Sequence, residues 1–240
     1  MEDRLYALMR AVEQDHWWFA GRRAVVEVLL ERLGRPRPPR VLDVGCGTGR
    51  NLELYARLGE VEGVDPSEEA VEFCRGRGLA GVHRAAATEL PFADGRFGLI
   101  TATDVIEHVA DDGAALAEMR RVSAPGGALL LTVPAYRWLW SAEDVRLQHH
   151  RRYTLGGLRR VAAAAGWKPV WGSYFNTLLL PPIALVRRLR RRSGGAPELE
   201  LAPRLLNGAL SLPMRLEAHL LGAGLRLPAG VSIGLLSRRD

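Results

Sequence analysis

The sequence predicts an α/β fold with a seven-stranded, mostly parallel sheet and helices on both faces. From residue 39 onward, short runs rich in Val, Leu and Ile alternate with helical patterns, which is typical of βαβ units. A chain of 240 residues with 48% hydrophobic residues is long enough to bury a sizeable core. A glycine-rich loop directly follows the first apolar run, as it does at the ligand edge of such sheets. The usual right-handed crossovers would make the sheet open and doubly wound.

The elements follow in order along the chain. Strands are expected at 40–44, 61–65, 82–85, 96–103, 128–133, 168–175 and 230–237. Helices are expected at 51–58, 67–78, 114–122 and 155–166, with Ser67 and Thr154 as N-caps. Turn residues 124–127 are expected to separate the third helix from the fifth strand.

Two segments do not fit the alternation, so we divide residues 1–240, taken as one domain, into four parts. These parts are an N-terminal helical lid at 1–38, a cofactor-binding core at 39–175, a helical insertion at 176–228 and a closing strand at 229–240. The insertion contains two apolar helical patterns around the linker SGGAPE (193–198).

Composition excludes several classes of protein. The net charge is +6, but five basic residues crowd into one run, which argues against a general nucleic-acid binder; they are Arg187, Arg188, Arg190, Arg191 and Arg192. Two cysteines without a CxxC spacing predict neither a disulfide framework nor a zinc site. We see no secretory leader and no apolar run of about 18 residues, so we expect a cytoplasmic protein without a transmembrane helix.

The loop in VLDVGCGTGR (41–50) raises the question of which nucleotide it holds. Its glycines have the spacing GxGxG, whereas the dinucleotide fingerprint GxGxxG requires glycine where this chain has Arg50. Asp43, at the end of the first strand, would repel a pyrophosphate but favour a cofactor with a sulfonium and an ammonium group. Asp65, at the tip of the second strand, is placed to accept hydrogen bonds from ribose hydroxyls, which would suit NAD equally well.

Four motifs resemble, in order and spacing, those of class I S-adenosylmethionine-dependent methyltransferases, in particular the small-molecule group that includes the ubiquinone/menaquinone methyltransferases. They are VLDVGCGTGR (41–50), VEGVDPS (61–67), ELPFADGRFGLITATDVIEHVADD (89–112) and MRRVSAPGGALLLTVP (119–134). The flanking HWWF (16–19) and HHRRYT (149–154) are similar to those of a bacterial subgroup of this superfamily. The resemblance implies a Rossmann-like fold.

The resemblance also implies that the cofactor is S-adenosylmethionine and the product S-adenosylhomocysteine. The residues it assigns to the cofactor are Asp43, Gly45, Cys46, Gly47, Gly49, Asp65, Pro66, Ala87, Thr88 and Asp104. Many relatives have an aspartate before the LPF that holds the adenine amino group, whereas this chain has three alanines at 85–87. That contact must therefore come from the backbone of Ala87 or Thr88, or be absent.

An oxygen acceptor would benefit from a base within hydrogen-bond reach. The residues that we expect on the acceptor side are His108, His149, His150, Tyr153 and His16. Structural roles are the alternative. His108 could have a purely structural role after the fourth strand, and residues 149–153 could form a solvent-exposed loop that leads into the next helix. Trp17 and Trp18 fit a lid or core role better than a substrate platform. No ligand spacing indicates a metal, and methyl transfer does not require one.

The sequence therefore predicts in-line transfer of a methyl group to a small-molecule or lipid-linked acceptor. A nucleic-acid methyltransferase is the first alternative, but it would favour an NPPY-like tetrapeptide where this chain has TDVIEH (103–108). The second alternative is a non-catalytic S-adenosylmethionine-binding protein. The insertion is expected to be an acceptor lid or a dimer contact in a monomeric or homodimeric enzyme. In the competing interpretation, its leucines and arginines contact the inner face of a membrane.

Overall fold

The computed structural model describes residues 3–34, 39–190 and 204–240. The linker at 193–198, Arg191 and Arg192 lie outside the described residues. The helices are α1 (Asp3–Val12), α2 (Trp17–Arg32), α3 (Leu52–Tyr55), α4 (Glu68–Gly76), α5 (Asp112–Val122), α6 (Ala142–Arg146), α7 (Leu155–Ala164), α8 (Leu180–Arg190) and α9 (Arg204–Gly222), with 3-10 turns η1 (Ile106–His108) and η2 (Arg137–Leu139). The strands are β1 (Arg40–Val44), β2 (Glu60–Asp65), β3 (Val82–Arg84), β4 (Phe97–Thr103), β5 (Ser123–Pro134), β6 (Lys168–Phe175) and β7 (Ser232–Arg238).

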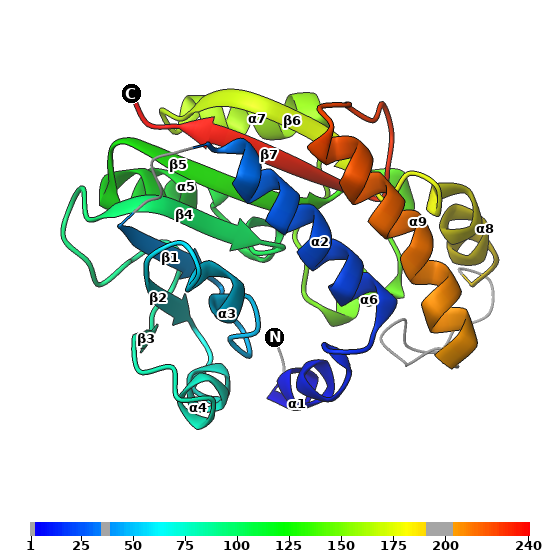
Figure 1. Ribbon diagram of the computed structural model, residues 1–240, viewed down its shortest axis with the longest axis horizontal. Coiled ribbons are helices and arrows are strands. Elements are labelled where there is room, and N and C mark those ends of the chain that lie inside the picture. Colours follow the sequence, from blue (N-terminus) through cyan, green and yellow to red (C-terminus); the bar gives the residue numbers. More distant parts are fainter. Residues whose placement is uncertain (1–2, 35–38, 191–203) are drawn as a thin grey trace.

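The strands form one seven-stranded sheet in the order β3-β2-β1-β4-β5-β7-β6 (Figure 1). Five strands pair in parallel from β3 to β5, whereas β7 runs antiparallel between β5 and β6. The predicted Rossmann-like α/β fold is confirmed. The parallel strands end together at one edge, and the segments that follow β1, β2 and β4 meet there.

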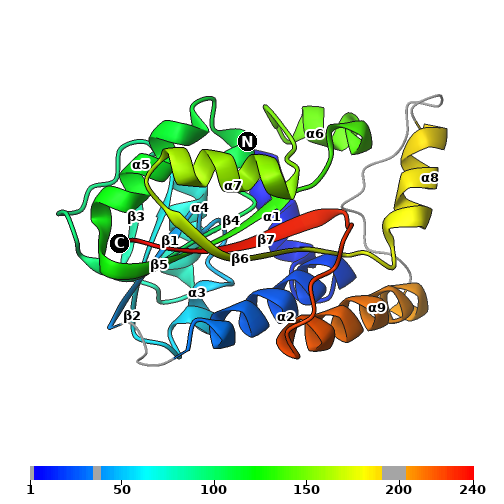
Figure 2. The same cartoon turned by 90° about the horizontal axis from the view of Figure 1, so that it is seen from above.

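Helices cover both faces of the sheet, with α2 and α9 on one side and α5 and α7 on the other (Figure 2). The core is accordingly divided into two clusters. One packs α5 and α7 against side chains of β4 and β5 such as Ile100 and Leu131. The other packs α2, α3, α4 and α9 against the opposite side chains, such as Leu99 and Leu130. Strands buried on both faces explain the near-continuous apolar runs in the sequence.

Local signals define most of the helix starts. The predicted caps are confirmed, because Ser67 Oγ accepts a hydrogen bond from Ala70 N and Thr154 Oγ1 accepts one from Gly157 N. Two boundaries differ from the prediction by three residues or more. The expected helix at 51–58 is regular only over α3, and β5 begins at Ser123 because Ser123 pairs with Phe97 ahead of a register shift. The turn residues 124–127 therefore lie within the strand.

The insertion lies against the N-terminal helices, and α9 runs beside α2 in both views (Figures 1 and 2). Trp17 N donates a hydrogen bond to Asn207 Oδ1 of α9, at 2.8 Å. The buried Glu217 of α9 accepts hydrogen bonds of 2.7–3.0 Å from the backbone N–H groups of Thr177 and Leu178, just before α8. In the described ranges, no helix combines the length and the apolar character needed to cross a membrane.

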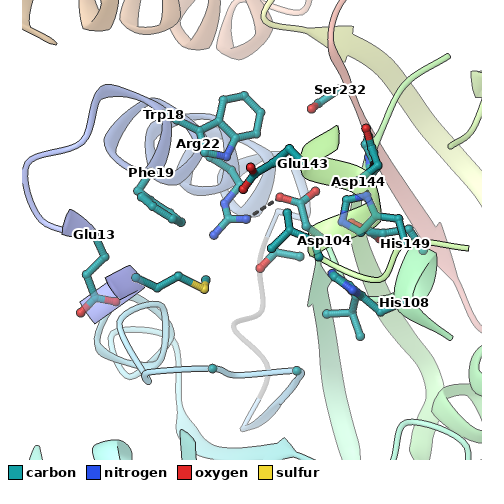
Figure 3. Close-up of a pocket in the computed structure, with 18 of the residues that line it drawn as sticks. Glu13, Trp18, Phe19, Arg22, Asp104, His108, Glu143, Asp144, His149 and Ser232 are labelled. Atoms are coloured by element: carbon teal, nitrogen blue, oxygen red, sulfur yellow. Dashed lines mark hydrogen bonds and ion pairs between the residues drawn. The ribbon is translucent and has the colours of Figure 1, made fainter. Parts of the chain in front are cut away.

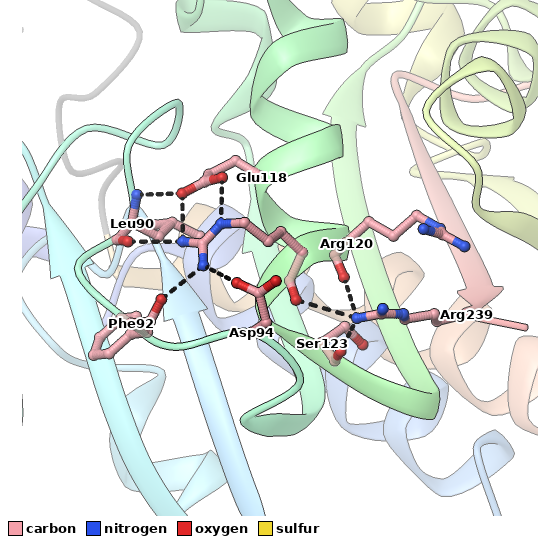
Figure 4. A network of polar contacts seen from close by, with 8 residues as sticks. Leu90, Phe92, Asp94, Glu118, Arg120, Ser123 and Arg239 are labelled. Carbon is pink, nitrogen blue, oxygen red and sulfur yellow. Dashed lines mark hydrogen bonds and ion pairs between the residues drawn. The ribbon is translucent and has the colours of Figure 1, made fainter.

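An arginine network holds the loop between β3 and β4 against α5 (Figure 4). Arg121 donates hydrogen bonds to the carbonyls of Leu90 and Phe92, at 3.0 and 2.8 Å, and to the carboxylate of Asp94 at 2.6 Å. Glu118 accepts hydrogen bonds from Arg121 and from Leu90 N. Since residues 85–88 of this loop line the cavity described below, the network positions part of its wall.

Candidate active site

A cavity of about 1160 Å³ opens at the carboxyl ends of the strands. One part is lined by the glycine loop after β1, the tip of β2 and residues 85–88. The other part is lined by residues 143–150, α8 and α9. Residues of α1 and the start of α2, including Trp17 and Trp18, line it as well, and Figure 3 shows Glu13, Trp18 and Phe19 on that side. Residues from both segments that interrupt the predicted alternation, 1–38 and 176–228, therefore line the same cavity.

The glycine loop is shaped by close contacts. Gly45 N and Cys46 N donate hydrogen bonds to Val64 O of β2, at 2.8 and 3.0 Å. Gly45 has a φ of +69°, and a Cβ there would lie 2.5 Å from Val105 Cγ2. Gly47, with a φ of +55°, has open space where its Cβ would be and lines the cavity. A ligand can therefore approach the backbone closely at Gly47.

Asp65 lies at the predicted position at the tip of β2 and is 3% exposed. Its carboxylate accepts hydrogen bonds from Gly47 N at 2.9 Å, Ser67 N at 3.0 Å and Tyr6 Oη at 2.9 Å. Burial raises the pKa of Asp65, and these three hydrogen bonds oppose the increase. Tyr6 comes from α1, so the N-terminal helix contacts the carboxylate that we expect to hold a ribose.

Two of the predicted cofactor residues do not line the cavity. Asp43 is 1% exposed and accepts a 2.6 Å hydrogen bond from Thr101 Oγ1. Burial raises the pKa of Asp43 to about 7, against the lowering effects of Thr101 and Arg22. Gly49 packs against other residues, since a Cβ there would lie 2.8 Å from Cys74 Sγ. The other eight line the cavity: Gly45, Cys46, Gly47, Asp65, Pro66, Ala87, Thr88 and Asp104.

Asp104 adopts a φ of +56°, directly after β4. It forms an ion pair with Arg22 of α2 (Figure 3). It also accepts a 3.2 Å hydrogen bond from Thr132 Oγ1. Arg22 Nε is buried without a hydrogen-bond partner among the described residues. Sequence reasoning missed Arg22, although it lies one helical turn after Trp18 and would therefore share a helix face with that residue.

Three of the predicted histidines, His108, His149 and His150, line the cavity. The rings of His108 and His149 have centroids 4.5 Å apart (Figure 3). Burial and, to a smaller extent, the neighbouring His149 lower the pKa of His108 to about 4. His149 Nδ1 lies 2.8 Å from Oδ1 of the buried Asp144, and His150 N donates a hydrogen bond to Glu107 O. His108 is therefore neutral at physiological pH.

Two predicted acceptor residues have structural partners. His16 caps α2, because its Nδ1 accepts a 3.2 Å hydrogen bond from Trp18 N, while it also lines the cavity. Tyr153 does not line the cavity; its hydroxyl donates a 2.6 Å hydrogen bond to Asp112. Burial, together with Asp112, raises the pKa of the Tyr153 hydroxyl.

Glu107 and Asp144 are further site residues that sequence reasoning missed. Glu107 is fully buried in η1, and burial raises its pKa well above the usual value. Asp144 is 1% exposed and bonds to Arg152 at 2.7 and 3.0 Å, and hydrogen bonds from His149 and Arg152 lower its pKa despite burial. The signal for Glu107 was its place in the quoted TDVIEH motif, whereas Asp144 lies outside all of the motifs.

Comparison with known proteins shows that part of the chain is similar to methyltransferases. Residues 42–131 match a family model described as a methyltransferase domain. The chain is 34% identical over 158 residues to malonyl-[acyl-carrier protein] O-methyltransferase of Pseudescherichia vulneris, with 62% of each protein covered. It is 38% identical over 112 residues to ubiquinone biosynthesis O-methyltransferase of Caulobacter sp. (strain K31), covering 42% of this chain and 44% of the relative. The chain thus spans less than two thirds of the length of these relatives.

The fold extends beyond the matched segment. A chain from the complex between the Haloferax volcanii Trm112 methyltransferase activator and a methyltransferase superposes with a TM-score of 0.66 at 17% identity. The superposition covers 99% of this chain and 95% of that one, and at this identity it shows the fold. The family model and the named relatives agree with the motifs around the glycine loop, and residues 42–131 are similar to the methyltransferase domain of class I S-adenosylmethionine-dependent enzymes.

Proposed function

We propose that this protein transfers a methyl group from S-adenosylmethionine to a hydroxyl oxygen of a small-molecule acceptor that has an apolar portion. The observation that carries the proposal is the single cavity in which the glycine loop and Asp65 face a histidine cluster. Two relatives named as O-methyltransferases support oxygen as the acceptor atom. Because the chain spans only part of those relatives, their acceptors are not transferred to it.

The residues present fit S-adenosylmethionine. Gly47 leaves open space beside the loop, and Asp65 offers a carboxylate for the ribose hydroxyls. Arg22 Nε, buried and without a partner among the described residues, is suited to the methionine carboxylate, while Asp104 suits the ammonium group. When bound, the cofactor supplies an electrophilic methyl group on a sulfonium with a neutral leaving group. The protein contributes mainly alignment and exclusion of water.

The acceptor portion of the cavity combines imidazoles with apolar side chains. His108 and His149 face one another, and His108 is neutral, as a base must be before it accepts a proton. The apolar residues that line this part are Leu179, Ile183, Val186, Leu206 and Leu210. We therefore propose that α8 and α9 form a lid over an apolar acceptor. Contact of the insertion with a membrane stays a prediction, which flotation with anionic vesicles tests.

Calorimetry with S-adenosylmethionine, S-adenosylhomocysteine and NAD tests the cofactor assignment. We expect both sulfur ligands to bind and NAD to bind poorly, and comparable affinity for NAD would overturn the assignment. Methyl-labelled cofactor, incubated with enzyme and a cell extract, then tests catalysis by mass spectrometry of the products. One labelled species carrying a new O-methyl group is expected; no cofactor turnover in any extract would support the non-catalytic alternative.

A further inference from the structure

The cavity contains a cluster in which the proposed methyl transfer leaves one member, Glu107, without a role. Glu107, His108 and His149 each offer a ligand atom, and these atoms all lie within 4.8 Å of one another. Glu107 and His108 come from η1, while His149 comes from the loop after α6, 41 residues further along the chain. The fold therefore brings together three potential metal ligands, although their spacing in the sequence does not indicate a metal site.

Glu107 is the unusual member of the cluster. It is fully buried, and in the described part of the chain neither of its carboxylate oxygens hydrogen-bonds another residue. Arg22 and Arg152 act electrostatically on Glu107. Their guanidinium groups, however, form hydrogen bonds with other carboxylates. An unsatisfied buried polar group costs about 1–3 kcal/mol, and a charged one costs more. A bound cation would provide the missing partner.

The imidazole of His149 is oriented for coordination. Its Nδ1 lies 2.8 Å from Oδ1 of Asp144, and a carboxylate only accepts hydrogen bonds, so Nδ1 carries a proton and the neutral imidazole has its lone pair on Nε2. Asp144 is itself held by Arg152 and by Ser141 N at 2.8 Å. Histidines that bind metals almost always donate their second N–H group to such a partner. This outer contact is already present around His149.

We infer that Glu107, His108 and His149 bind a divalent first-row transition metal ion on the acceptor side of the cavity. Two imidazoles and one carboxylate suit ions such as Zn²⁺, Co²⁺ or Mn²⁺ better than Mg²⁺, which prefers oxygen ligands. Metal–ligand bonds of about 2.1 Å place ligand atoms about 3.4 Å apart in a tetrahedral site, so distances between ligand atoms shorten by up to about 1.4 Å on binding. Three protein ligands leave a coordination position open for the acceptor.

The role of the ion in the reaction rests on the proposed function. The ion takes the acceptor hydroxyl as a further ligand and lowers its pKa, so that its proton passes to bulk water. The oxygen then forms a bond to the methyl carbon as the carbon–sulfur bond breaks. The electron pair of that bond stays on sulfur, and S-adenosylhomocysteine leaves neutral. The acceptor class is therefore a hydroxyl compound that can ligate a metal, such as a phenol or a catechol.

Titration of the chelator-treated, full-length protein with Co²⁺ tests the site by visible absorption. We expect one Co²⁺ per chain, displaced by Zn²⁺ and not by Mg²⁺. Glu107→Gln and His149→Ala should each weaken Co²⁺ binding by more than about 100-fold, since loss of even an outer-shell partner weakens metal binding by about 10- to 100-fold. His219→Ala, which removes an exposed histidine from α9, is the matched control and should bind Co²⁺ as the wild type does.

Folding is checked by thermal unfolding of the metal-free proteins. Glu107→Gln should be at least as stable as the wild type, because it removes a buried carboxylate without a partner. Absence of Co²⁺ bands in the wild type, or unchanged binding in folded Glu107→Gln, would overturn the inference. Calorimetry with S-adenosylhomocysteine on the same samples separates the two proposals. Cofactor binding without metal binding would leave the proposed function standing, whereas metal binding without cofactor binding would refute that function alone.

Discussion

Replacement of the buried Asp43 by asparagine tests how much the ionised carboxylate lowers the free energy of unfolding. The pKa of Asp43 is raised from 3.8 to about 7, chiefly because burial disfavours the carboxylate. In the unfolded chain it titrates near its ordinary value, so between about pH 4 and 7 the folded state binds more protons than the unfolded state. The stability that the folded state gains from protonated Asp43 is therefore fully present below about pH 4. It is lost as the pH rises to about 7.

A shift of about three pKa units corresponds to about 4 kcal/mol, at 1.36 kcal/mol per unit. Asparagine removes the charge but keeps an oxygen that can accept the 2.6 Å hydrogen bond from Thr101. We therefore expect Asp43→Asn to raise the free energy of unfolding by about 2–4 kcal/mol at pH 8 and to change it little at pH 4.5. Asp65 and Arg22, which act electrostatically on Asp43, are common to both proteins.

Urea unfolding, followed by circular dichroism at the two pH values, measures the difference. Asp15→Asn is the control, because Asp15 is exposed and its replacement should change stability by less than about 0.5 kcal/mol at either pH. An equal effect of Asp43→Asn at both pH values, or a loss of stability at pH 8, would refute the reasoning. The same variant should weaken binding of S-adenosylmethionine more than that of S-adenosylhomocysteine, because only the former carries a sulfonium charge.

Three further substitutions probe the loop and its surroundings. Asp65→Asn should weaken binding of S-adenosylhomocysteine by about 1–3 kcal/mol, or about 5- to 150-fold in Kd by calorimetry; an unchanged Kd would remove Asp65 from the site. Gly45→Ala should destabilise the fold by about 2–4 kcal/mol in urea unfolding, because its φ is +69° and its Cβ would meet Val105. Recovery of part of that loss in the double variant with Val105→Ala is expected, and no recovery would contradict the clash. Tyr153→Phe should lose about 1 kcal/mol of stability with its hydrogen bond to Asp112, while calorimetry should detect no change in cofactor affinity.

The sequence by itself determined the fold class and the cofactor loop, because both depend on local patterns. Apolar runs of strand length, caps such as Ser67 and the glycine spacing at 45–49 are each read within a few residues. The positive φ of Gly45 is likewise a local property of the turn, whereas its close approach to Val105 is a tertiary contact. The position of Asp65 at a strand tip follows from the same kind of local pattern.

Tertiary structure alone decided which distant residues share the cavity. The placement of β7 between β5 and β6 depends on how the insertion returns the chain to the sheet, which no local pattern specifies. Arg22 meets Asp104 only because the start of α2 lies at the cavity, and His149 meets Glu107 only because the loop after α6 lies against η1. Asp43 comes directly before Val44, which lines the cavity, yet the side chain of Asp43 does not line it. The reason is that successive side chains of a strand point to opposite faces of the sheet.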